Sequence, residues 1–111
     1  MIGLYVRTNI LTASQIQELT LPPRRTLIIG RSKDSDIVIE DETVSRFHAE
    51  LVEAGDGRFY LTDRNSSSGT WRREGGDWAK VRQCFVEADD PLMLGTHAIT
   101  VAQLLAVRDR Q

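Results

Sequence analysis

The stretch Gly30-Arg31-Ser32 follows the apolar run Leu27-Ile28-Ile29, so Arg31 stands at the end of a predicted strand. Two further polar stretches also lie at the ends of strand-like runs: Ser45-Arg46-Phe47-His48, which begins fourteen residues after Arg31, and Asp63-Arg64-Asn65-Ser66-Ser67-Ser68-Gly69-Thr70. Loops at strand ends can meet at one rim of a β-sandwich. We therefore expect the three stretches to form a single site at that rim.

The residue types in these stretches predict a site for an anion, and for phosphate in particular. The planar guanidinium of Arg31 stays charged at any working pH and suits phosphate oxygens bidentately. Ser45 and the run Ser66-Ser67-Ser68 supply short hydroxyl donors. The turn next to Gly69 can present backbone N–H groups to the same anion.

Alternating apolar residues predict many short strands and no need for an amphipathic helix. The alternating sets are Ile2, Leu4 and Val6; Leu27 and Ile29; Ile37 and Ile39; Phe47, Ala49 and Leu51; Phe59 and Leu61; Leu92 and Leu94; and Ile99 and Val101. Turn formers such as Gly55-Asp56-Gly57 separate the runs. The pattern indicates an all-β sandwich of two antiparallel sheets. A strand is favoured over a helix for Ala13–Glu18, and the polar tail 107–111 is expected to fray.

Length and composition predict a single domain over residues 1–111. The 111 residues, 41% hydrophobic and 27% charged, are typical of one globular unit. The net charge of -2 argues against a nucleic-acid groove, and no N-terminal apolar run is long enough for a secretion signal or a membrane span. The single cysteine suits a reducing compartment, and no Cys/His pair has metal-ligand spacing. We therefore predict a cytoplasmic protein with no membrane partner, cofactor or metal.

The three polar stretches together resemble the forkhead-associated (FHA) domain, with strong motifs over about residues 28–70 and a looser match to about residue 101. The resemblance implies an FHA-like β-sandwich whose ligand site lies in loops at one end. It also implies a non-enzymatic module that binds phosphothreonine in a partner protein or peptide and acts in Ser/Thr-kinase signalling.

The resemblance assigns roles to individual residues. Arg31, Ser45 and Ser67 fall on phosphate-contacting positions, and Arg46 falls on a position that often contacts the peptide backbone. Ser68 replaces the Asn that usually clamps the peptide main chain. Four residues fall on supporting positions of the site: Gly30, His48, which usually braces the loop, Gly69 and Thr70.

Two other functional readings compete with phosphopeptide binding. The replacement at Ser68 is compatible with a phosphate-independent protein–protein interaction platform on the same fold. A hydrolase could use Ser45, His48 and Asp63, but Ser45 and His48 lie three residues apart next to a strand, so their side chains tend toward opposite faces. Nothing else in the sequence has the form of a nucleophile motif, and we predict no enzymatic activity.

Two tryptophans, Trp71 and Trp78, flank the polar turn 72–77. This spacing favours a hairpin in which the two rings face each other or pack in the core. The alternative is that they form a surface anchor for a protein partner.

Overall fold

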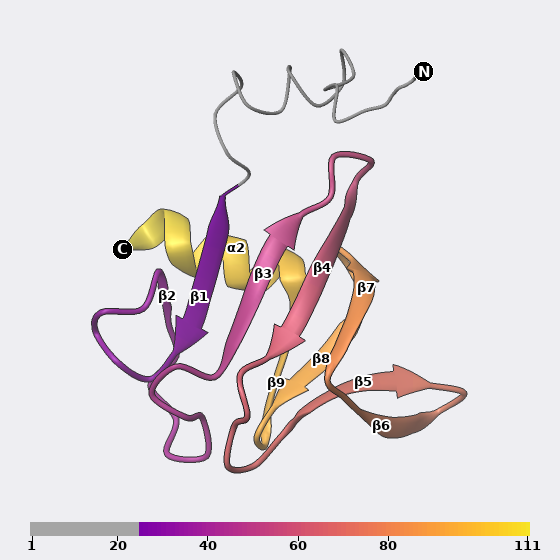
Figure 1. Cartoon of the computed structure of the whole chain (residues 1–111), viewed down its shortest axis with the longest axis horizontal. Coiled ribbons are helices and arrows are strands. Elements are labelled where there is room, and N and C mark those ends of the chain that lie inside the picture. The colour runs from indigo at the N-terminus through magenta and orange to yellow at the C-terminus, as the bar shows by residue number, and fades with distance from the viewer. Residues whose placement is uncertain (1–24) are drawn as a thin grey trace, which may run out of the picture.

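The computed structural model describes residues 25–111 of the chain (Figure 1). The expected strands at Ile2–Val6 and Ala13–Glu18 lie outside the described residues. Strands dominate the described part, and one helix follows the last strand. Within residues 25–111, no helix is long and apolar enough to cross a membrane.

The strands form two sheets, as the alternating pattern predicts. The five-stranded sheet has the order β2-β1-β3-β4-β7, with β1 at Thr26–Gly30, β2 at Ile37–Val38, β3 at Ala49–Glu53, β4 at Arg58–Asp63 and β7 at Gln83–Glu87. The four-stranded sheet has the order β6-β5-β8-β9, with β5 at Thr70–Glu74, β6 at Asp77–Val81, β8 at Pro91–Leu94 and β9 at His97–Thr100. The predicted all-β sandwich is confirmed.

One strand pair departs from the expected antiparallel arrangement. Strands β1 and β2 run parallel, with Ile29 opposite Ile37, whereas the other paired strands are antiparallel. The loop between β1 and β2 therefore has to carry the chain back along β1 before β2 begins. This crossover loop contains Arg31.

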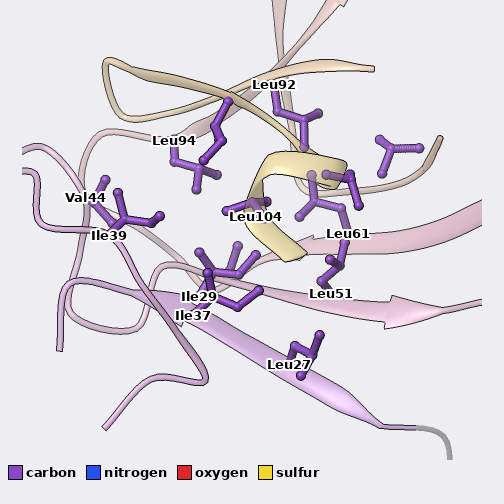
Figure 2. Packing of buried hydrophobic residues seen from close by; sticks show 14 residues of the cluster. Leu27, Ile29, Ile37, Ile39, Val44, Leu51, Leu61, Leu92, Leu94 and Leu104 are labelled. Carbon is purple, nitrogen blue, oxygen red and sulfur yellow. The ribbon is translucent and has the colours of Figure 1, made fainter. Parts of the chain in front are cut away.

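The core lies between the sheets because their inner faces carry the alternating apolar residues. Leu27, Leu51 and Leu61 are directly opposite one another on β1, β3 and β4, and each is almost fully buried. Figure 2 shows them packing toward residues of the other sheet. Within residues 25–111, the buried core residues are Leu27, Ile29, Ile37, Ile39, Val44, Ala49, Leu51, Leu61, Val86, Leu92, Leu94, Ile99, Val101 and Leu104. Burying one such side chain stabilises the fold by about 1.5–3 kcal/mol.

The predicted strand ends at Phe47 and Val101 are wrong. Strand β3 begins only at Ala49, and Phe47 lies in the preceding loop with 41% of its surface exposed. Val101 begins helix α2, Val101–Arg110, instead of extending β9. A capping box starts this helix, since Thr100 Oγ1 accepts from Gln103 N at 3.1 Å and Gln103 Oε1 accepts from Thr100 N at 2.9 Å.

The expectation of a fraying C-terminal tail is also wrong. Helix α2 buries Val101 and Leu104 completely, and the helix lies behind the five-stranded sheet in Figure 1. At its end, Gln111 Oε1 accepts from Val38 N at 2.9 Å, and Gln111 Nε2 donates to Asp36 O at 3.0 Å. The side chain of Gln111 thus takes the place of a neighbouring strand on the outer edge of β2.

We expect Leu104→Ala to lower the free energy of unfolding by about 2–5 kcal/mol, because it removes a fully buried side chain and leaves a cavity. Leu105→Ala, on the half-buried neighbour, is the matched control and should cost clearly less. Urea denaturation followed by circular dichroism measures both values. Equal losses for the two variants would contradict the packing of α2 into the core.

Candidate functional site

The three polar stretches meet at one end of the sandwich, where the loops after β1, β2 and β4 lie together (Figure 1). Backbone hydrogen bonds join the first two loops, because Arg31 N donates to Ser45 O at 3.0 Å and Ser32 N donates to Arg46 O at 3.1 Å. The third loop joins through Ser67 N, which donates to Ser45 Oγ at 3.0 Å. The sequence-predicted site residues thus occupy one connected rim.

Gly30 allows the first two loops to cross. A Cβ atom at this position would lie 2.0 Å from Arg46 O, and the contact is with backbone that cannot swing away. Any other residue would push the loop of Ser45 and Arg46 away from Arg31. The glycine therefore sets the spacing between these side chains.

The Arg31 side chain is exposed and held at one point. Its Nε donates to Val44 O at 3.0 Å, which aligns the guanidinium, and the residue remains exposed to solvent. Among residues 25–111, no carboxylate lies within ion-pair distance of Arg31. The guanidinium is therefore oriented and has its charge available for an external anion.

The ring of His48 ties the loop of Ser45 to the loop of Gly69. The ring is completely buried, Nδ1 accepts from Ser45 N at 2.9 Å, and Nε2 lies 2.9 Å from Gly69 O. Because Nδ1 is an acceptor, the network assigns the proton to Nε2, which donates to Gly69 O. Burial lowers the pKa of His48 and outweighs the opposing effects of the Gly69 carbonyl and of Asp63, so the ring stays neutral.

Asp63 organises the third loop, a role that the sequence did not indicate. Its carboxylate accepts from Ser66 N at 3.1 Å, from Ser66 Oγ and from Thr70 Oγ1 at 2.7 Å. Burial acts to raise its pKa, but the hydrogen bonds from Ser66 and Thr70 outweigh burial and lower the pKa. Ser66 Oγ in turn accepts from Gly69 N at 3.0 Å, and Gly69 has a φ of 88°. The Asp-x-x-Ser spacing is a local turn signal that could have pointed to this role.

The remaining predicted ligand contacts lie on the surface of the rim. Arg46, Ser67 and Ser68 are all exposed. Ser45 Oγ accepts from Ser67 N, which leaves its own proton free to donate. The Ser68 carbonyl accepts from Trp71 Nε1 at 3.1 Å, so the backbone of Ser68 is anchored while its hydroxyl faces outward.

The geometry argues against a hydrolytic triad. Both ring nitrogens of His48 are already engaged, one with Ser45 N and the other with Gly69 O. No ring nitrogen is left to accept the proton of the Ser45 hydroxyl, although Asp63 Oδ1 lies 4.0 Å from His48 Nε2. Among residues 25–111, no group of three or more His, Cys, Asp and Glu side chains could hold a metal ion.

The prediction that Trp71 and Trp78 face each other is wrong. The register of β5 and β6 places Trp71 opposite Lys80 and Arg73 opposite Trp78. Each indole instead has a cationic partner, with Lys80 Nζ 5.9 Å from the Trp71 ring centroid and Arg73 Cζ 5.3 Å from that of Trp78.

Comparison with known proteins identifies the family, because the model of the FHA domain matches residues 27–95. The chain belongs to the FHA domain family. A curated relative, the FHA domain-containing protein PS1 of Arabidopsis thaliana, is 37% identical over 49 residues, which are 43% of this chain and 3% of that protein. The chain therefore spans only a small part of that relative.

Solved FHA domains share the fold of this chain. The FhaA FHA domain complexed with the intracellular domain of Rv3910 is 30% identical, with 72% of this chain and 82% of that chain covered and a TM-score of 0.60. A structure from a structural and functional analysis of phosphothreonine-dependent FHA domain interactions is 30% identical, with 71% and 77% covered and a TM-score of 0.61. The loops described above therefore belong to a fold that this chain shares with solved FHA domains.

We expect the pKa of His48 to lie below its ordinary 6.5 in the folded protein. The unfolded chain then takes up a proton first as pH falls, so the stability from the neutral ring is full above about pH 6.5 and is lost below it. NMR titration of the ring and urea unfolding between pH 7.5 and 5 measure the effect.

The second histidine is the control for this prediction, because His97 is half-buried and its Nδ1 lies 3.2 Å from Asp41 Oδ2. A His97→Gln variant should keep the loss of stability below about pH 6.5. If His97→Gln removes that loss, His48 is not its source. The contribution of Asp63 to the pH dependence of stability is separate, because a carboxyl group with a lowered pKa affects stability only near and below its ordinary pKa of 3.8.

Proposed function

We propose that this chain is a phosphopeptide-binding module that recognises phosphothreonine in a partner protein within Ser/Thr-kinase signalling. The observation that carries the proposal is the oriented guanidinium of Arg31, which has no carboxylate partner among residues 25–111 and lies on the same rim as Ser45 and Ser67. The phosphothreonine-dependent interactions studied for a related FHA domain, 30% identical, support the same chemistry here.

In this mechanism the module binds reversibly and makes or breaks no covalent bond. A phosphothreonine carries about -1.5 to -2 charges at pH 7 and three strong acceptor oxygens. Arg31 neutralises that charge, and the hydroxyls of Ser45 and Ser67 donate to the phosphate oxygens. Arg46 and Ser68, both exposed beside them, hold the backbone of the peptide.

The supporting residues keep these donors in place before the ligand arrives. His48 links Ser45 to Gly69, and Thr70 and Ser66 bind Asp63 at the base of the third loop. Because the loops already have their backbone hydrogen bonds, little ordering remains to be done on binding. A preorganised rim of this kind raises affinity by lowering the entropy cost of association.

We expect Arg31→Ala to weaken phosphothreonine-peptide binding about 30- to 5,000-fold while the domain stays folded. Removing one partner of a charge-assisted contact costs about 2–5 kcal/mol, which takes a micromolar complex to a dissociation constant of about 30 μM to 5 mM. Isothermal titration calorimetry measures the affinity, and circular dichroism checks the fold.

The matched control is Arg73→Gln, which removes an exposed arginine that lies over Trp78 on the β5–β6 hairpin. This variant should bind the phosphopeptide like the wild type. Unphosphorylated peptide is the second control, and equal binding of both peptides would favour the phosphate-independent platform. Undiminished affinity of Arg31→Ala would disprove the role of Arg31 in phosphate binding.

We expect Ser68→Asn to tighten phosphopeptide binding by about 0.5–1.5 kcal/mol, the net contribution of one hydrogen bond. The Asn amide is longer than the Ser hydroxyl and can both donate to and accept from the peptide backbone. If Arg46 already holds that segment, the gain appears only in an Arg46→Ala background. A double-mutant cycle of these two positions measures the coupling, and weaker binding in both backgrounds would show that Ser68 is wrongly assigned.

A further inference from the structure

Two basic side chains line an open hollow beside the loop of Ser66 and Ser67. The hollow is bordered by Asp63, Asn65 and Ser66 on one side and by Lys80, Val81 and Arg82 on the other. Lys80 and Arg82 are exposed, and no carboxylate among residues 25–111 lies within ion-pair distance of either. Both cations are therefore available to an anion from outside.

Lys80 is positioned by the same loop that forms the phosphate rim. Its Cε would lie 3.1 Å from a Cβ at Gly69, and its Nζ is 5.9 Å from the Trp71 ring centroid. The Trp71 indole donates to Ser68 O at 3.1 Å, which connects this aromatic platform to the loop backbone. The lysine is held next to the rim by its apolar stem, with its ammonium group in solvent.

Arg82 is fixed at the base of the loop by its backbone. It lies between β6 and β7, where the chain passes from the four-stranded sheet to the five-stranded sheet, and its carbonyl accepts from Asp63 N at 2.7 Å. The backbone of Arg82 is thus tied to the start of the loop. Arg82 lines the same hollow as Lys80, and its side chain is exposed.

Asp63 also borders the hollow, but its carboxylate is already occupied. It accepts three hydrogen bonds from Ser66 and Thr70 and makes no ion pair with Lys80 or Arg82. Asp63 keeps its negative charge, but its oxygens are engaged by Ser66 and Thr70, so the two cations next to the phosphate rim are left without a direct carboxylate partner among residues 25–111. An acidic group on a bound peptide is the partner that these cations favour.

We propose that Lys80 and Arg82 form a second anion subsite, which takes an acidic side chain of the same peptide near the phosphothreonine. This inference rests on the proposed function, because the phosphate at Arg31 anchors the peptide. The acidic group is a carboxylate or a second phosphate. Ser66 borders the hollow, and its neighbour Ser67 donates to Ser45 Oγ, so the hollow lies next to the rim. An extended peptide advances about 3.3–3.6 Å per residue, so we expect the acidic residue a few positions from the phosphothreonine.

The test uses phosphothreonine peptides in a neutral sequence, with Glu and, in a second series, phosphoserine placed in turn at each flanking position. Wild type is compared with the double variant Lys80→Met, Arg82→Gln, in which Met keeps the apolar stem against Trp71. Arg73→Gln is the matched control, because it removes a cation from the same hairpin but outside the hollow. Fluorescence anisotropy measures the affinities, and circular dichroism checks that each variant is folded.

We expect one flanking position at which Glu tightens wild-type binding about two- to fivefold, the range of exposed ion pairs. Phosphoserine at that position should tighten it further, because its charge is larger. The double variant should lose this preference and bind the neutral phosphopeptide like the wild type, while Arg73→Gln keeps the preference. A preference for phosphoserine without one for Glu assigns the subsite to a second phosphate.

The opposite results overturn the subsite. If the wild type binds the phosphopeptides without preference for an acidic residue at any position, or if the preference survives in the double variant, Lys80 and Arg82 do not form a subsite. If the double variant binds neutral and acidic phosphopeptides equally more weakly than the wild type does, Lys80 and Arg82 act through a general positive field and not through a local contact with the acidic residue. If the wild type binds none of the phosphopeptides, the proposed function itself fails, and the subsite with it.

Discussion

The buried ring of His48 is the interaction on which the binding rim depends. It accepts from Ser45 N and donates to Gly69 O, which lies 21 residues after His48 in the sequence. The ring thus joins the loop before β3 to the loop before β5. A buried polar ring has no water to replace a lost partner, so both hydrogen bonds must be made in the folded state. The positions of Ser45 and Ser67 follow from this constraint, because Ser67 N binds Ser45 Oγ.

The position of the rim also depends on the two connections by which the chain passes between the sheets. Asp63 ends β4 in one sheet, Thr70 begins β5 in the other, and the hydrogen bond between their side chains closes the loop at 2.7 Å. Arg82 lies where the chain returns to the five-stranded sheet, between β6 and β7, and its carbonyl accepts from Asp63 N. The two crossings lie side by side, so the loop that faces the proposed phosphate also borders the basic hollow.

Different residues stabilise the loops and face the proposed ligand at this end of the sandwich. Backbone groups and buried side chains hydrogen-bond to one another, whereas the side chains of Arg31, Arg46 and Ser67 are exposed and can donate to a ligand. A rim of this kind can bind and release an anionic peptide without rearranging the sandwich. That property suits the proposed reversible binding of a phosphopeptide.

The sequence by itself determined the strands and the three polar stretches, because alternation and turn residues are local signals. It missed helix α2, although the Thr100-x-x-Gln103 capping box was readable, because Ile99 and Val101 continued the strand alternation. Only the tertiary structure decided the contact of Gln111 with β2 and the place of Lys80 beside Gly69. These contacts join residues distant in sequence, and their energies come from packing that no local pattern encodes.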